Sequence, residues 1–175
     1  MTVHADGWVF GYGSLMWNPG FAFEERRKAT LSGYHRAFCV YSHHYRGTAE
    51  RPGLVLGLAS GGSCRGMAYR VAGSDWDGVV AYLDERELIG YAYRQAHLAI
   101  RLDADCQVEA LTYVADTDHP QFAGALDDDT AAGLIAAAEG ISGTNRDYAR
   151  NLVRELESHG FHDEHLTRLL AHIGA

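Results

Sequence analysis

Two short segments of the sequence carry residues that could do chemistry. The first is a glycine-rich turn after the apolar residues 8–10, and it consists of Gly11, Tyr12, Gly13, Ser14, Leu15 and Met16. Two glycines around one tyrosine let the backbone turn sharply and approach a ligand closely. Such a turn can aim several backbone N–H groups at one anionic group. An ordinary strand-to-loop turn is the alternative, because short glycine loops are common.

The second segment is acidic and lies near the end of an expected helix. Glu87 comes four residues after Leu83 and therefore shares its apolar face, whereas Glu85 does not. A carboxylate against a core is costly unless it is paired or functional. Burial also raises its pKa, which suits a general base. If this helix frays at its end, Glu87 faces water instead.

Apolar patterns predict the elements that must position these segments. We expect strands over residues 8–10, 29–42, 54–59, 64–71, 93–102 and 107–115, with a turn at residues 61–63 and a bend or break at Gly33. Helical spacing predicts helices from near Ser74 to near Gly90 and over residues 130–139, 147–159 and 164–172, the third capped by Thr144 or Asn145. This mixture is typical of an α+β protein in which helices flank a strongly curved or closed sheet.

Length and composition limit the class of protein. The 175 residues are 47% hydrophobic and carry a net charge of −8, so we expect one soluble domain spanning residues 1–175, monomeric by default. The negative charge argues against binding nucleic acid or an anionic membrane surface. No apolar run approaches the roughly 20 residues of a membrane span. Three scattered cysteines and no recognisable signal segment favour the reducing cytoplasm.

Five segments, in order, give the sequence a family resemblance. They are 10–15 (Phe-Gly-Tyr-Gly-Ser-Leu), 45–48 (Tyr-Arg-Gly-Thr), 66–70 (Gly-Met-Ala-Tyr-Arg), 82–87 (Tyr-Leu-Asp-Glu-Arg-Glu) and 143–148 (Gly-Thr-Asn-Arg-Asp-Tyr). The sequence resembles the γ-glutamylcyclotransferase superfamily, and Met16-Trp17 points to its ChaC-like branch, which acts on glutathione. The resemblance implies a small β-barrel flanked by helices.

The resemblance also implies a reaction and a site. The γ-glutamyl bond of glutathione would be cleaved by intramolecular cyclisation, which gives 5-oxoproline and cysteinylglycine. Glu87 falls on the catalytic glutamate of the ChaC-like segment, the loop 11–16 would hold the substrate, and Tyr148 would orient the γ-glutamyl group. This lactam chemistry requires no metal and no organic cofactor.

Other interpretations of these residues stay open at this point. Tyr148 can simply pack on the barrel, and Arg46 fits an exposed surface arginine better than a carboxylate ligand. The substrate could be another γ-glutamyl amide or dipeptide, or the protein could be a non-catalytic binder of small molecules. Hydrolysis by a cysteine nucleophile would need Cys39, Cys64 or Cys106 beside an activating histidine.

Overall fold

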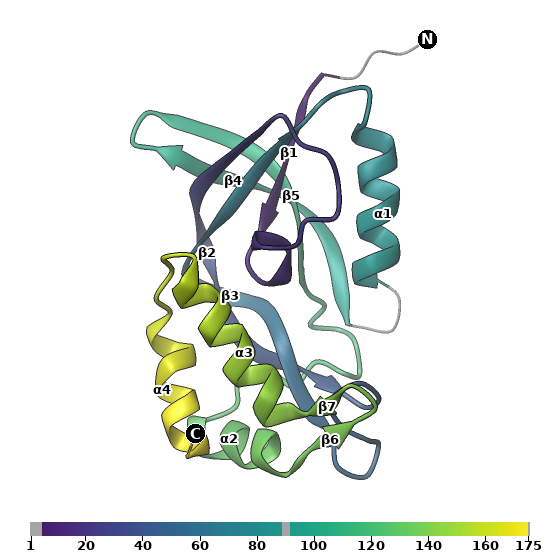
Figure 1. Cartoon of the computed structure of the whole chain (residues 1–175), viewed down its shortest axis with the longest axis vertical. Helices are drawn as coiled ribbons and strands as arrows, with labels where there is room; N and C mark the ends of the chain where they lie inside the picture. The colour runs from purple at the N-terminus through teal and green to yellow at the C-terminus, as the bar shows by residue number, and fades with distance from the viewer. Residues whose placement is uncertain (1–4, 89–91, 175) are drawn as a thin grey trace. The chain divides into compact units, whose positions relative to one another are not determined.

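The computed structural model describes residues 5–88 and 92–174 (Figure 1). The barrel strands are β1 (Gly7–Gly11), β2 (Glu25–Ser42), β3 (Gly53–Val71), β4 (Tyr93–Asp103) and β5 (Cys106–Ala115). The helices are η1 (Ser14–Met16, a 3-10 turn), α1 (Trp76–Leu88), α2 (Asp128–Ala137), α3 (Asn145–Ser158) and α4 (Glu164–Ile173). Two short strands, β6 (Glu139–Gly140) and β7 (Gly143–Thr144), pair with each other.

The five long strands form a closed barrel in the order β1-β3-β2-β4-β5. β1 pairs antiparallel with β3, with Val9 opposite Tyr69, and parallel with β5, with Val9 opposite Leu111. β2 pairs antiparallel with β4, with Leu31 opposite Ile100. The predicted α+β barrel is therefore confirmed, and its sheet is closed, which removes unpaired strand edges.

The strands β2 and β3 are longer than the sequence predicted. The predicted strands 54–59 and 64–71 are parts of β3, and the predicted turn at residues 61–63 does not end that strand. Gly61 and Gly62 have φ values of +104° and +71°, and Gly33, inside β2, has +93°. Glycine adopts these angles without a steric penalty, so β2 and β3 each continue through these positions as one strand.

The described residues fall into two compact units. The first contains residues up to 35 and residues 60–114, and the second contains residues 36–59 and those from 115 onward. Each of the strands β2 and β3 has one end in the first unit and the other end in the second unit. A single domain over residues 1–175 stays a prediction.

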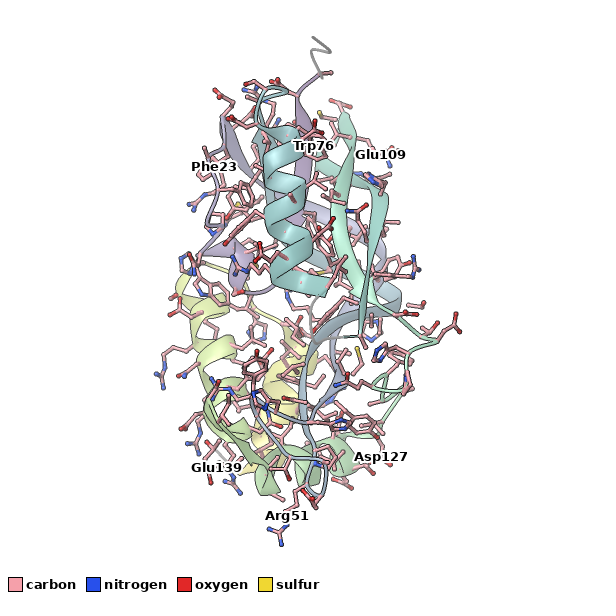
Figure 2. All side chains as sticks on the ribbon, turned by 90° about the vertical axis from the view of Figure 1, so that its right-hand side faces the viewer. Phe23, Arg51, Trp76, Glu109, Asp127 and Glu139 are labelled. Carbon is pink, nitrogen blue, oxygen red and sulfur yellow. The ribbon has the colours of Figure 1, made fainter. Side chains whose placement is uncertain are left out.

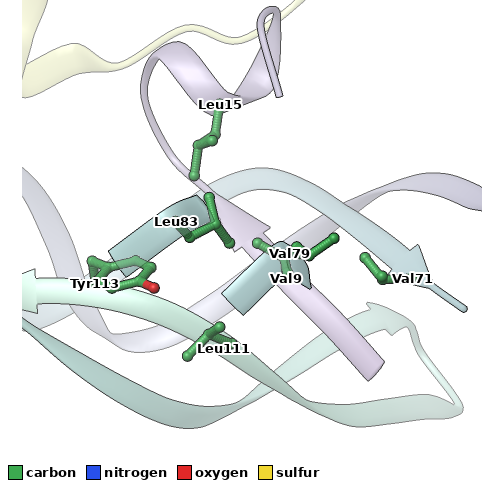
Figure 3. Close-up of a cluster of buried hydrophobic side chains, with 7 residues drawn as sticks. All are labelled: Val9, Leu15, Val71, Val79, Leu83, Leu111 and Tyr113. Carbon is green, nitrogen blue, oxygen red and sulfur yellow. The ribbon is translucent and has the colours of Figure 1, made fainter. Parts of the chain in front are cut away.

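A cluster of apolar side chains fixes α1 against the strands of the first unit. Figure 3 shows it, and its members are Val9, Leu15, Val71, Val79, Leu83, Leu111 and Tyr113. Trp76, at the start of α1 (Figure 2), packs so closely on Gly7 that any side chain there would collide with its ring. The predicted apolar face of this helix is confirmed. Its expected stop at Gly90 lies outside the described residues.

In the second unit the helix starts are set by caps. Asp127 caps α2 by accepting a hydrogen bond from the Thr130 N–H, and Thr144, one of the two expected residues, caps α3. α2 begins and ends two residues earlier than predicted, and Glu139 belongs to β6. Among the described residues, no helix is long and apolar enough to cross a membrane.

Candidate active site

The glycine-rich loop follows β1 directly and is held in place by two tyrosines of the first unit. The chain leaves the strand at Gly11 and forms the 3-10 turn η1. The Tyr69 hydroxyl lies 2.8 Å from the carbonyl oxygens of both Leu15 and Met16. The Tyr12 hydroxyl donates to the Tyr113 carbonyl oxygen at 2.8 Å. These hydrogen bonds attach the loop to the barrel strands β3 and β5.

Glycine is required in this loop for space. A Cβ at Gly11 would lie 2.8 Å from the Leu15 Cβ, closer than real Cβ contacts. A Cβ at Gly66 on β3 would collide with the Gly11 carbonyl oxygen. Neither glycine has a positive φ, so lack of space rather than a special turn accounts for both: the Leu15 side chain lies against Gly11, and the Gly11 backbone lies against Gly66.

Glu87 lies in the last turn of α1, within the first unit. Its side chain is half-buried, at 21% exposure, while Glu85 is exposed. Burial raises the pKa of the Glu87 carboxyl above its ordinary value, and the positive charge of Arg86 opposes that rise. The arrangement predicted from the helical spacing is therefore present: one carboxylate toward the core and its neighbour in water.

Arg86 connects this glutamate to the glycine-rich loop. One guanidinium nitrogen donates to the Ser14 hydroxyl at 2.8 Å, and another donates to the Asn18 carbonyl oxygen at 2.8 Å. Its Nε lies 3.6 Å from a Glu87 carboxylate oxygen. The loop and the glutamate are thus brought together by one side chain. Arg86 lies in the ChaC-like segment 82–87, but the family resemblance implied no role for it.

A second set of contacts that the sequence did not reveal anchors the end of α1. The Tyr113 hydroxyl donates to an Asp84 carboxylate oxygen at 2.7 Å, and the Gln95 amide donates to the same oxygen at 3.0 Å. Burial, and then the negative charge of Asp84, raise the pKa of the Tyr113 hydroxyl well above its usual range. Tyr113 therefore stays protonated and donates. Only the folding of β4 and β5 against α1 brings these residues to Asp84.

Tyr148 lies in the second unit, on the first turns of α3. Its hydroxyl accepts a hydrogen bond from the Leu56 N–H at 3.0 Å, and its ring packs edge-on against Phe38. Three residues earlier, the fully buried Asn145 accepts from the Leu54 N–H at 2.8 Å and donates to the Leu54 carbonyl oxygen at 2.9 Å. These two side chains bond the backbone of β3 as a neighbouring strand would.

Two further expectations from the sequence are resolved in the second unit. Arg46 is not an exposed surface arginine: it is half-buried, donates to the Thr144 carbonyl oxygen at 3.1 Å and lies over the Tyr148 ring. Cys39 is buried, and desolvation raises the pKa of its thiol to about 12. A thiol that does not ionise near neutral pH is a poor nucleophile. Within residues 5–88 and 92–174, no three His, Cys, Asp or Glu side chains lie close enough to hold a metal ion.

The fold is a small closed barrel, and Arg86 links a half-buried glutamate to the glycine-rich loop. The ChaC-like protein family matches residues 7–175, and the chain belongs to that family. It is 40% identical over 166 residues to the glutathione-specific gamma-glutamylcyclotransferase of Escherichia coli, a match that covers 95% of this chain and 72% of that protein. It is 33% identical over 173 residues to the human glutathione-specific gamma-glutamylcyclotransferase 1, covering 95% and 78% of the two chains.

A solved structure agrees with the fold. The crystal structure of a yeast gamma-glutamyl cyclotransferase specific to glutathione superposes with a TM-score of 0.84, at 22% identity, over 97% of this chain and 96% of that chain. At this identity the likeness concerns the fold alone.

Proposed function

We propose that this protein cleaves the γ-glutamyl bond of glutathione and releases 5-oxoproline and cysteinylglycine. The observation that carries the proposal is the half-buried Glu87, with its raised pKa, joined through Arg86 to the glycine-rich loop. Its position matches the catalytic glutamate of the ChaC-like segment. Membership of the ChaC-like family and relatives named as glutathione-specific cyclotransferases support the choice of substrate.

The reaction joins two groups of one substrate molecule. The α-amine of the γ-glutamyl residue attacks its own side-chain amide carbonyl carbon, forming the C–N bond of a five-membered lactam. The former amide C–N bond breaks, and the amine of cysteinylglycine leaves. Because nucleophile and electrophile belong to one molecule, holding it in an attack conformation supplies much of the rate. The enzyme needs no covalent nucleophile.

Glu87 would move the one proton that this reaction transfers. As a carboxylate it accepts a proton from the attacking amine, and as an acid it returns that proton to the leaving nitrogen. A raised pKa brings the carboxyl closer to the operating pH, where both steps are efficient. The backbone N–H groups of residues 11–16 would hold the substrate carboxylate or the tetrahedral oxyanion.

The remaining assignments extend this proposal. Tyr148 orients the γ-glutamyl group, and the hydrogen bond from the Leu56 N–H, which holds its hydroxyl in one place, supports that role. The protein works as a monomer in the cytoplasm, without a metal or an organic cofactor. Three free cysteines suit the reducing compartment in which glutathione is kept as a thiol.

The test measures 5-oxoproline and cysteinylglycine released from reduced glutathione by the purified protein. Glu87→Gln should abolish most of the release, while Glu85→Gln, its exposed neighbour on the same helix turn, should leave it intact. No release by a wild-type protein that binds glutathione would point to a binding protein. Release from another γ-glutamyl amide alone would keep the chemistry and change the substrate. Full activity of Glu87→Gln would remove Glu87 from the mechanism.

A further inference from the structure

The contacts of Arg86 differ from those of an ordinary surface arginine. Its side chain is only 21% exposed, and its three nitrogens meet different groups: Nη2 the Ser14 hydroxyl, Nη1 the Asn18 carbonyl oxygen, and Nε the Glu87 carboxylate. A planar guanidinium presents its donors in a fixed fork, so its two hydrogen-bonded partners in the loop are held in one geometry. The Glu87 carboxylate oxygen, 3.6 Å from Nε, makes an ion-pair contact with the same group.

Further contacts extend this connection along the loop. The Nη1 atom also donates to the Pro19 carbonyl oxygen at 3.3 Å and to the Tyr82 hydroxyl at 3.2 Å. Gly20, with φ +75°, sits so close to Tyr82 that a Cβ there would collide with its hydroxyl. Residues 14–20 are therefore packed against α1 and bonded to it through Arg86.

We propose that Arg86 is a positioning residue: its guanidinium clamps the substrate loop, through Ser14 and Asn18, to the helix end that carries Glu87. This inference rests on the proposed function, because it concerns the same loop and the same glutamate. A substrate held by residues 11–16 then lies in a loop that is bonded to the neighbour of Glu87, and that neighbour also contacts the Glu87 carboxylate. Small errors in such an alignment are expensive, since a displacement of about 1 Å can cost a hundredfold in rate.

The clamp also has an electrostatic consequence. The positive charge of Arg86 lowers the pKa of Glu87, and the Glu87 carboxylate in turn acts on Tyr113, whose hydroxyl is neutral and bonded to Asp84. Removing the Arg86 charge would therefore leave the effect of burial, which disfavours the carboxylate form of Glu87, without the opposing effect of Arg86. Activity that depends on this carboxylate would then require a higher pH.

Two substitutions separate the clamp from the charge. Arg86→Gln removes both, so kcat/KM should fall about a hundredfold, and the acidic limb of its pH profile should move to higher pH. Arg86→Lys keeps the charge but not the fork, so kcat/KM should fall about tenfold while the acidic limb stays in place. Arg27→Gln, which removes an arginine paired with Asp103 elsewhere in the first unit, is the matched control and should match the wild type.

Amide hydrogen exchange of residues 14–20 gives a readout that does not depend on turnover. It should quicken in both Arg86 variants and not in Arg27→Gln. If the wild type releases no 5-oxoproline, the proposed function fails, and faster exchange would still support the clamp. A folded Arg86→Gln with an unmoved acidic limb, or with loop exchange unchanged from the wild type, would overturn the inference. A lower melting temperature alone, with wild-type kcat/KM, would reduce Arg86 to a structural residue.

Discussion

The end of α1 and the start of α3 use polar side chains in opposite ways. At the start of α3, Asn145 is fully buried and both ends of its amide are bonded to the backbone of Leu54. At the end of α1, Glu87 is partly exposed, keeps a raised pKa and meets an arginine at 3.6 Å. Both segments belong to the family resemblance, but the buried polar group of the first is an uncharged amide, whereas that of the second is a titratable carboxyl.

The comparison separates two reasons for placing a polar group near a core. A buried amide with every bond made stabilises the fold, because each partner would otherwise be stranded away from water. A half-buried carboxylate costs stability and is kept where it has a chemical task. Substitutions at the two places should therefore move different observables.

The largest effect is expected for Glu87→Gln. A general base and acid contributes about 10²–10⁴-fold, so kcat should fall about a thousandfold in 5-oxoproline release. Stability should not fall. A carboxyl whose folded pKa is raised stabilises the protein below its unfolded pKa and loses that contribution as the pH rises through the folded pKa. At neutral pH the variant should therefore melt at or above the wild-type temperature, and a clear drop would contradict this assignment.

The pH dependence of the wild type tests the same carboxylate without a substitution. If Glu87 is the general base, as proposed, kcat/KM should fall tenfold for each unit of pH below its folded pKa. Because burial raises that pKa, the midpoint of the acidic limb should lie above the ordinary value for glutamate. A limb at or below the ordinary value would show that another group controls activity.

At the other helix, Asn145→Ala should act on stability. It strands the buried N–H and C=O of Leu54, and the free energy of unfolding should drop by about 3 kcal/mol in urea titration. Thr144→Ala, which removes the neighbouring cap from the Asp147 N–H, is the control and should cost about 1 kcal/mol. An Asn145→Ala protein as stable as this control would mean that the strand-like pairing contributes little.

Tyr148→Phe gives the smallest expected change. It tests whether this tyrosine only stabilises the fold, as Asn145 does, or also acts on the substrate. Removal of its hydroxyl removes the hydrogen bond from the Leu56 N–H, which should cost about 1 kcal/mol of unfolding free energy. If the hydroxyl also orients the γ-glutamyl group, KM for glutathione should rise several-fold. A loss of stability with an unchanged KM would leave Tyr148 with the structural role alone.

Local pattern predicted a good part of the fold. The amphipathic spacing of Val79 and Leu83 identified the buried face of α1 and placed Glu87 toward the core, because side chains four residues apart share a helix face. The error at residues 61–63 has an equally local cause. Glycines usually mark a turn, but Gly61 and Gly62 lie inside the single strand β3. The place of β3 between β1 and β2 in the barrel is not visible in the local sequence.

The sequence by itself therefore determined most of the helices and strands, the family and the candidate glutamate, because helical periodicity and short motifs are properties of neighbouring residues. Closure of the barrel, the pairing of Asn145 with β3 and the contacts of Asp84 with Tyr113 were decided by tertiary structure. So was the place of Arg86 between Ser14 and Glu87. Each of these joins residues far apart in the chain or depends on the direction of a side chain, and such contacts are fixed only when the strands and helices pack.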